Sequence, residues 1–543
     1  MNDVVRNYTW GNLKRRRRSV HHRSRGLAKF LLPVFAVMIV GYLWLTRDNY
    51  MPNEFIPADS GVEIYMLNPV DKRTDIFSSR VFSLAPEGSE AHAVINQLAG
   101  ELPLPEWLLN NICAGPFHVS AASADHLGDA VIMTRMTRVG TLTSRLASFA
   151  PQVHVEYTGG LRLRYIPDAS LYYAVRGRTL LVSMSRNRLV YALTLHPTNA
   201  LEASQYRQGV LAATQADLFC RLGPAAFPWT PPVFAQMETA LRVGSDTVHL
   251  TTNGTLSPAF TEHYTPFLAT LTPQPLPMPL DGFLTTSVAA NMDLPALLTH
   301  LSESLPALAA AAEMLAEPQP EDMTAELIED MQTLLQQALR STGSRMRFAW
   351  SDLDPYEMMP APLISATFDI NTYDVIALFE RVAPAPEVSS GVDLAPRLDE
   401  EHMLAYAPFV GGEAIEPAIT LYANGMLVSS SANLAREQLR TAPLTETYPQ
   451  DGNFLLRIQP HPMATAIVDV AREFAASGLL RDHTEPSLEA AAAPWLDAVE
   501  AIDSVVLFAY GDNGQLHADL TLTMHDASDT PNAATPLEAA DEE

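Results

Sequence analysis

Apolar and polar residues alternate along most of this chain, and one long apolar run stands apart from that pattern. The run extends from Leu27 to Thr46 and has the length of about 20 residues that a helix needs to cross a bilayer. Beyond it, short alternating runs predict β-strands, and Ala- and Leu-rich stretches with helical spacing predict helices. The pattern predicts an α+β protein in which one N-terminal transmembrane helix precedes antiparallel sheets with helices packed on them.

Turn-forming residues divide the exported part into elements. Leu171–Val175 and Thr179–Met184 predict a hairpin across Arg176-Gly-Arg178. The Pro-rich passage from Pro224 to Pro232 predicts the beginning of a helix just after it. Asn253-Gly254 is a strong type I′ signal and predicts the hairpin turn that closes the first unit.

The order of elements recurs further along the chain. Five segments match later ones in the same order, at offsets between 229 and 257 residues, which predicts two tandem copies of one α+β module. The copies span residues 55–270 and 271–525. The matched pairs are Phe117–Ala122 with Met346–Ser351, Phe149–Pro151 with Val382–Pro384, Leu180–Ser185 with Met426–Ser431, Phe219–Pro224 with Leu455–Pro460, and Asp246–Leu250 with Asp503–Leu507.

The second copy differs from the first in its helical arm. Leu294–Leu315 and Met323–Arg340 are rich in Ala and Leu and predict a helical hairpin packed on the sheet. Residues 526–543 are acidic and rich in Ala, Thr, Asp and Pro, which predicts a disordered tail.

Basic residues before the apolar run determine its predicted orientation. The positive-inside rule keeps residues 1–26 in the cytoplasm and residues 27–46 in the membrane as an anchor. The run passes into Trp44–Asp48 without the small-x-small site of a cleaved signal peptide, so the anchor is expected to stay. The sequence predicts a single-pass protein of a bacterial inner membrane with most of the chain in the periplasm. The determinants of this topology are Lys14, Arg15, Arg16, Arg17, Arg18, Arg23 and Arg25.

Charge differs sharply between the two sides of the predicted membrane. The net charge is −27, but residues 1–46 carry +8 and the remainder holds 26 Lys and Arg against 61 Asp and Glu. A body this acidic repels nucleic acid and anionic lipid surfaces, which disfavours both as partners.

Sequence motifs of catalysis, phosphate binding and metal binding are absent. The chain has no Gly-x-Ser-x-Gly, His-Glu-x-x-His or Cys-x-x-Cys motif and no glycine-rich phosphate loop. No catalytic, cofactor-binding or metal-binding residue is therefore predicted, and no cofactor is expected. Asp352–Asp354 and Asp512–Gly514 are interpreted as turns, Asp399–Glu401 as a solvated linker and His461 as a helix-start residue.

Two residue pairs allow a structural interpretation. Cys113 and Cys220 both fall in the predicted exported part, where an oxidising compartment permits a disulfide; two free thiols are an equal alternative. Arg221 and Arg457 match in the two copies and are interpreted as closing a strand end against acidic neighbours.

The overall plan resembles that of bacterial single-pass membrane-anchored envelope proteins in an uncharacterised domain-of-unknown-function family. The resemblance is carried by Ile56-Pro-Ala-Asp59 and by the hairpin from Tyr173 to Ser183. It implies an envelope location and duplicated α+β modules, and it implies no catalytic residues.

Three functions agree with these features. The leading hypothesis is a non-enzymatic binding or scaffold protein of the envelope, held to its membrane by one helix and engaging an envelope protein partner. A carrier or sensor of a lipid or other apolar ligand is an alternative, because sheets covered by helices can enclose a pocket. A hydrolase with a spatially assembled site is the third.

Overall fold

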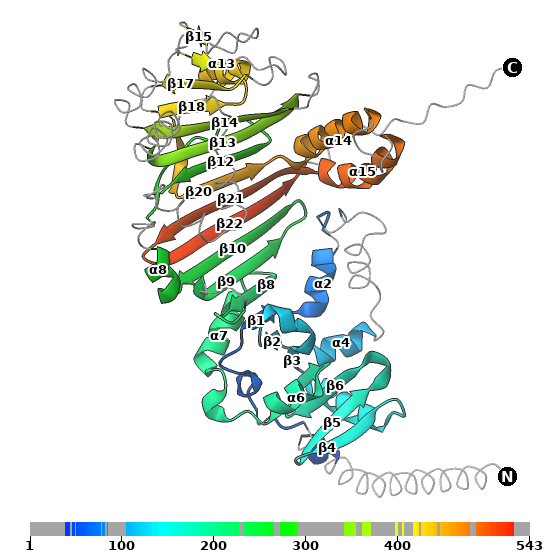
Figure 1. The fold of residues 1–543 in the computed structure, drawn as a ribbon. Coiled ribbons are helices and arrows are strands. Elements are labelled where there is room, and N and C mark those ends of the chain that lie inside the picture. The colour runs from blue at the N-terminus through cyan, green and yellow to red at the C-terminus, as the bar shows by residue number, and fades with distance from the viewer. Residues whose placement is uncertain are drawn as a thin grey trace, which may run out of the picture. The chain divides into compact units, whose positions relative to one another are not determined.

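The structure is a computed structural model (Figure 1), and it describes much of the chain in segments separated by gaps. Its described segments are residues 38–43, 46–48, 50–77, 79–81, 84, 105–226, 233–264, 272–290, 342–354, 361–370, 397–399, 404–406, 416–422, 425–441, 446–477 and 485–525. They form two compact units: unit 1 is Met1–Ser60, Met66–Val70 and Leu102–Gln208, and unit 2 is the remainder. The predicted mixture of helices and antiparallel sheet is confirmed.

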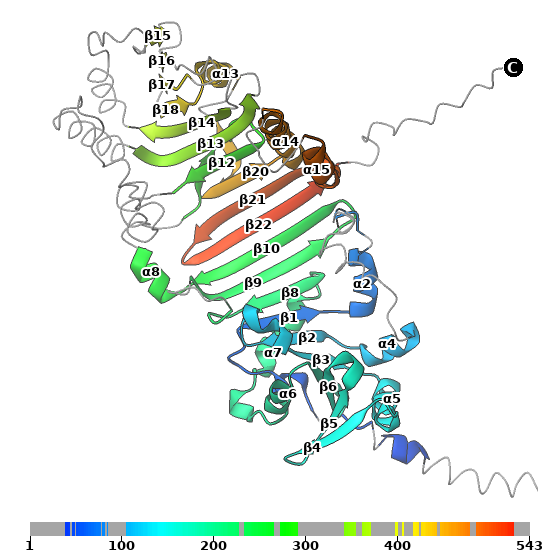
Figure 2. The same ribbon diagram turned by 45° about the vertical axis from the view of Figure 1, so that its right-hand side comes forward.

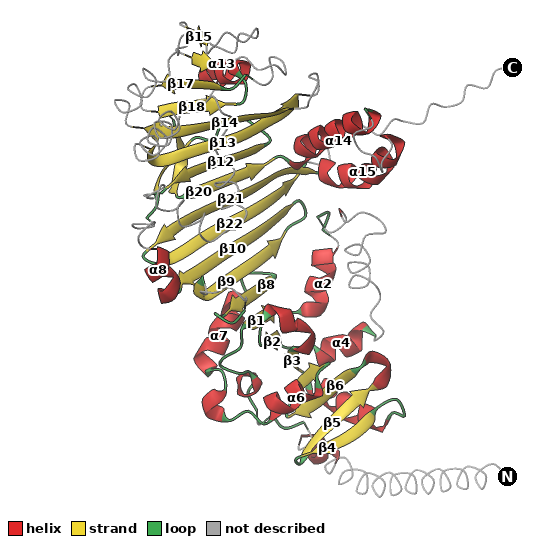
Figure 3. Cartoon of the chain, in the orientation of Figure 1, coloured by secondary structure: helices red, strands yellow, loops and turns green. Residues whose placement is uncertain are grey.

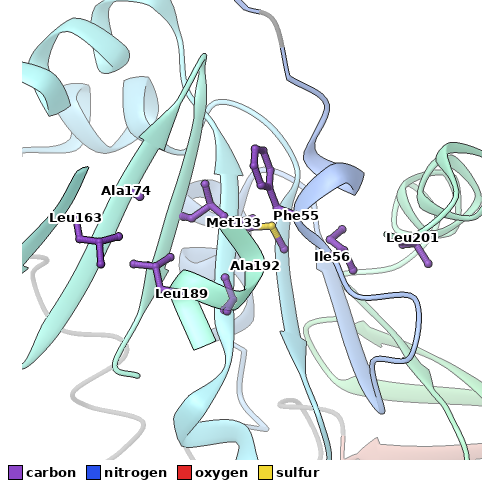
Figure 4. Packing of buried hydrophobic residues seen from close by; sticks show 10 residues of the cluster. Phe55, Ile56, Met133, Leu163, Ala174, Leu189, Ala192 and Leu201 are labelled. Carbon is purple, nitrogen blue, oxygen red and sulfur yellow. The ribbon is translucent and has the colours of Figure 1, made fainter. Parts of the chain in front are cut away.

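Unit 1 contains an antiparallel sheet with the strand order β4-β5-β6-β7-β3-β2. The helix α6 packs on it, and its Leu189 belongs to one buried cluster with Leu181 and with Met133, Leu163 and Ala174, which Figure 4 shows. The hairpin expected at Gly177 is present, with φ +58° at that residue. The strands are β2 (Phe117–Ala121), β3 (Val131–Arg135), β4 (His154–Thr158), β5 (Leu161–Ile166), β6 (Leu171–Arg176) and β7 (Thr179–Ser183). The helices are η1 (Pro52–Phe55), α4 (Glu106–Ile112), η3 (Ala124–Asp129), α5 (Arg138–Leu146), η4 (Ala147–Phe149), η5 (Pro167–Ala169), α6 (Arg186–Leu193) and η6 (Pro197–Asn199).

Unit 2 is built on a long antiparallel sheet whose strands run side by side (Figures 2 and 3). Its order is β1 (Val62–Met66), β8 (Leu218–Leu222), β9 (Phe234–Val243), β10 (Thr247–Leu256), β22 (Gln515–Met524), β21 (Ile502–Asp512), β20 (Phe454–Ile458), β12 (Leu284–Ala289), β13 (Thr342–Asp354), β14 (Ala361–Ile370), β18 (Gly425–Ser429), β17 (Ala418–Tyr422), β16 (Leu404–Tyr406) and β15 (Arg397–Asp399). A two-stranded ribbon pairs β11 (Gln274–Pro277) with β19 (Thr447–Gly452). The helices of unit 2 are α8 (Pro258–Tyr264), α13 (Ala432–Thr441), α14 (Pro460–Ala476) and α15 (Glu485–Glu500), while α2 (Pro69–Phe77) and α7 (Ala203–Ala212) each have residues in both units.

Two stretches of the sequence build the same order of strand pairings. The order β4-β5-β6-β7-β3-β2 of unit 1 recurs within unit 2 as β15-β16-β17-β18-β14-β13. Likewise, β1-β8-β9-β10 and β12-β20-β21-β22 have the same order. The local detail recurs too, because Ser183 Oγ accepts a hydrogen bond from Ser185 N at 3.0 Å before α6. Ser429 Oγ accepts one from Ser431 N at 3.2 Å before α13.

The expected turn at Asn253-Gly254 is wrong. Both residues lie inside β10, where they pair with β9 and β22. Gly254 is needed for space rather than for a left-handed backbone, because a Cβ there would lie 2.6 Å from the Phe234 ring. The type I′ signal that does form a hairpin is Asn513-Gly514, with φ +49° and +80°, between β21 and β22.

The helix expected after the Pro-rich passage is also wrong, because that segment forms β9. Its sequence, FAQMETALRV, contains good helix formers, but hydrogen bonds to β8 and β10 on both sides outweigh that preference. One predicted repeat match is shifted as a result. Asp246–Leu250 lies at the beginning of the second strand of its hairpin, whereas Asp503–Leu507 lies in the first strand of the other.

Part of the predicted anchor is described. Residues 38–43 are helical, with Met38, Ile39 and Val40 exposed. Among the described residues no helix has the length and apolar character needed to span a bilayer. Residues 1–37, the helical arm at 294–340 and the tail at 526–543 lie outside the description.

Candidate functional site

The two faces of the unit 2 sheet differ in an unusual way. On one face, the ribbon β11–β19 and helix α13 cover the strands, burying Leu276 with Leu455 and Phe508 in one cluster and Leu427 in another. That covered face also buries many polar side chains. These are Thr285, Ser287, Arg347, Ser365, Thr367, Thr420, Ser429 and Asn453. In soluble antiparallel sheets the covered face is usually the apolar one.

Arg347 shows how the covered face accommodates a charge. The side chain is 3% exposed. Its Nε donates to Thr367 Oγ1 at 2.7 Å, its Nη2 to Tyr422 Oη at 3.0 Å and its Nη1 to the carbonyl of Met278 at 3.3 Å. A buried guanidinium is tolerated when its donors are used in this way.

Asn453 joins three segments on the same face. Its Nδ2 donates to the carbonyls of Thr272 and Ala289 at 2.8 and 2.9 Å, and its Oδ1 accepts from Gly511 N at 2.7 Å. Hydrogen bonds therefore hold Arg347 and Asn453 on the covered face, whereas the hydroxyl oxygens of Thr285, Ser287 and Ser365 have no hydrogen-bond partner among the described residues.

The opposite face carries a straight row of leucines. Because directly paired residues of an antiparallel sheet project to the same side, the register places one leucine from each of six neighbouring strands side by side. This leucine row consists of Leu218, Leu241, Leu250, Leu520, Leu507 and Leu456, on β8, β9, β10, β22, β21 and β20. All of them are half-buried.

Apolar residues flank the leucine row on both sides. One flank contains Val243, Val248, Leu522, Val505 and Ile458, and the other contains Ala518, Ala509 and Phe454. We call the row and its flanks the apolar face. Strand spacing makes the row about 24 Å long, and on β22, β21 and β20 three apolar rows make the face about 13 Å wide.

The apolar face contains no charged side chain, and no described hydrophobic cluster includes any of its residues. The flank that contains Ala518 continues on β10 and β9 with Thr252 and Thr239, whose hydroxyl oxygens lie 3.3 Å apart. Such a surface favours apolar partners through area removed from water, at about 25 cal/mol per Å². A continuous apolar patch of several hundred Å² is typical of a binding surface.

Sequence reasoning missed the apolar face. Each strand showed its own alternation, but the row depends on the pairing of β10 with β22, in which the neighbours Leu250 and Leu520 are 270 positions apart in the sequence. The available signal was the series of apolar residues at alternate positions, Leu516, Ala518, Leu520 and Leu522, which the sequence pattern alone does not assign to a covered or an open face.

The matched arginines do not behave alike. Arg221 contacts Glu238 at 3.1 Å through Nε and the buried Glu63 at 3.7 Å through Nη1, as expected for a strand closed against acidic residues. Arg457 is exposed and pairs in register with Thr285 and Val506. Among the described residues, Arg221 has the acidic neighbours that the interpretation required and Arg457 has none.

Both cysteines are free thiols in the structure. Cys113 follows α4 in unit 1, and burial raises its pKa. Cys220 lies on β8 between Leu218 and Leu222, and burial raises its pKa to about 11. Such a thiol is protonated and unreactive near neutral pH.

The other residues of interest do not assemble into a site. Asp352 and Asp354 end β13, Asp512 begins the β21–β22 turn and His461 lies in the first turn of α14. Within the described segments, no group of three or more His, Cys, Asp or Glu residues is placed to hold a metal ion. The basic residues that determine the predicted topology lie outside the description.

Comparison with known proteins gives little guidance. No family model and no curated protein matches the chain. Among solved structures, TP0453 in crystal forms I, IV and III is similar at 10% identity and a TM-score of 0.23. The matches cover 39%, 40% and 41% of this chain and 80%, 85% and 89% of the other. A likeness this weak carries no argument about function.

Proposed function

We propose that this protein is a membrane-anchored binding protein of the bacterial envelope. It acts on the periplasmic side without catalysing a reaction, and its apolar face binds the acyl chains of lipids. The leucine row is the observation that carries the proposal. A periplasmic scaffold for a protein partner is the second candidate, since apolar patches also serve protein interfaces.

The proposal includes a tandem duplication. Its support is the recurrence of one strand order, together with the matching serine hydrogen bonds before α6 and α13. In this interpretation β10 and β22 are equivalent edge strands of the two copies, and their pairing extends the leucine row from one copy into the other.

The chemistry of the apolar face favours acyl chains over polar ligands. A polar ligand would lose its hydrogen bonds to water without replacement there, at a cost of about 1–3 kcal/mol per group. A hydrocarbon chain has no such cost and gains from each methylene removed from water. The anchor predicted at residues 27–46 would keep the surface near a supply of lipid.

A photoactivatable phospholipid, with a diazirine in one acyl chain, tests the proposal on the full-length protein in its own membrane. Irradiation followed by peptide mass spectrometry is expected to place adducts on β9, β10, β21 and β22. Adducts confined to residues 27–46 would overturn the lipid assignment. A cross-link from the apolar face to a second protein, or to residues 291–341 of the same chain, would also overturn it.

The chain offers a matched pair of variants. Leu250 and Leu520 are cross-strand neighbours in the leucine row, and Thr251 and Asp519 are the next neighbours on the opposite face. The double variant L250N/L520N is expected to reduce adduct formation at least about tenfold, because each leucine contributes about 1.5–3 kcal/mol when buried. The control T251N/D519N is expected to leave it unchanged.

A further inference from the structure

A small cleft in unit 1 is independent of the apolar face. It has a volume of about 80 Å³ and opens between the segment before β1, the end of β2, the beginning of β3 and helix α6. Its polar lining comprises Asp59, Ser60, Ser120, Asp129, Arg188 and Tyr191. Every one of these residues belongs to unit 1.

The serines of the cleft present acceptors rather than donors. Ser60 Oγ donates to the carbonyl of Pro57 at 2.7 Å and lies 2.8 Å from Ser120 Oγ. Because each hydroxyl has one proton, Ser120 must donate to Ser60. Both protons are therefore used, and the remaining lone pairs favour a ligand group that donates hydrogen bonds. The same arrangement leaves neither serine with a general base that would activate it as a nucleophile.

The charges of the cleft are not neutralised by neighbours. Across the described parts of the chain, no ion pair or hydrogen bond engages the side chains of Asp59, Asp129 or Arg188. Two carboxylates and one guanidinium therefore line the same small space. A ligand carrying both an ammonium and a carboxylate group would satisfy both signs of charge.

We propose that this cleft binds a free α-amino acid with a small side chain. Its ammonium group faces Asp59, Asp129 and the hydroxyl acceptors, and its carboxylate pairs with Arg188. The small volume favours a side chain of a few atoms, and Tyr191, which is 42% exposed, also lines the cleft.

Isothermal titration calorimetry, in which glycine, alanine or serine is added to the full-length protein, tests this proposal. Acetate and methylamine serve as half-ligands that each carry one of the two charges. The amino acids are expected to bind, and each half-ligand at least about tenfold more weakly, because each lacks one charged contact. Equal binding of methylamine and glycine, or no binding by any of the three amino acids at millimolar concentration, would overturn it.

Substitutions in the cleft test whether the amino acid binds there. R188Q and D129N are each expected to weaken alanine binding at least about tenfold, since each removes one charge-assisted contact. Arg138 and Asp168 are exposed residues of unit 1 outside the cleft, so R138Q and D168N are the matched controls. Near-UV circular dichroism of each variant establishes that it has folded. Binding that survives both cleft substitutions would place the amino acid elsewhere and overturn the proposal.

Discussion

The Nδ1 atom of His517 lies 2.5 Å from the side-chain oxygen of Asn253, directly across the ladder between β10 and β22. His249 and Thr521 stand in the same relation on the same strands, with 3.1 Å between Nδ1 and Oγ1. The two pairs are placed symmetrically about the centre of the ladder. The duplication proposed above would produce this symmetry, because β10 and β22 would then pair as equivalent edge strands around a local two-fold axis.

Gly254 and Gly514 should respond differently to alanine. Gly254→Ala places a Cβ 2.6 Å from the Phe234 ring, so we expect a loss of about 1–3 kcal/mol of stability, most of it recovered with Phe234→Leu. Gly514 has φ +80° and open space around it, so Gly514→Ala should cost about 1–2 kcal/mol through backbone strain alone. Urea unfolding measures both. Full recovery of G514A by F234L would contradict this explanation.

Local sequence patterns predict many of the individual elements, whereas the pairing of strands that are distant in the sequence could not be predicted from them. The hairpin at Gly177 and its second strand, in the segment Leu180–Ser185, could be predicted because the turn residue and the strand pattern lie within a few positions of each other. Phe234–Val243 was misread because helix-forming residues occupy a strand whose partners lie outside the local window. The leucine row could not be predicted, since its order depends on which distant strands become neighbours.

Arg221 and Arg457 offer a comparison of matched positions. Arg221→Met leaves the carboxylate of Glu63, which is 4% exposed, without its guanidinium neighbour. We therefore expect the free energy of unfolding to fall by about 3 kcal/mol or more. Arg457→Met removes an exposed side chain beside Thr285 and Val506 and should change stability by no more than about 0.5 kcal/mol. Denaturant unfolding of both variants checks the contrast. Equal losses would show that the two arginines have equivalent surroundings.

Cys220 should be slow to alkylate. Burial raises its pKa to about 11, so the thiol stays protonated at neutral pH and reacts about a hundredfold more slowly than in the unfolded chain. In a C113A background, the iodoacetamide rate should rise about tenfold per pH unit up to about pH 11. A rate that levels off near pH 9 would contradict the effect of burial.

The same shift links Cys220 to stability. The folded state keeps its proton at a pH where the unfolded state has lost it, so the unfolded state binds fewer protons. Stability should therefore fall as pH rises from about 9 to about 11, the window between the two pKa values. Replacing Cys220 by Ser should remove this contribution, which urea unfolding at several pH values would show as a smaller decline.

Replacing a leucine should destabilise the protein more on the covered face of the unit 2 sheet than on the apolar face. Leu427 is 0% exposed beneath α13, so Leu427→Asn should lower the free energy of unfolding by at least about 3 kcal/mol. Leu250 is half-buried on the apolar face, and Leu250→Asn should cost less than about 1 kcal/mol, because its side chain already meets water. Thermal unfolding of the two variants, with lipid removed, measures the difference. If L250N were as damaging as L427N, the leucine row would be an ordinary covered core and its proposed role in binding would be lost.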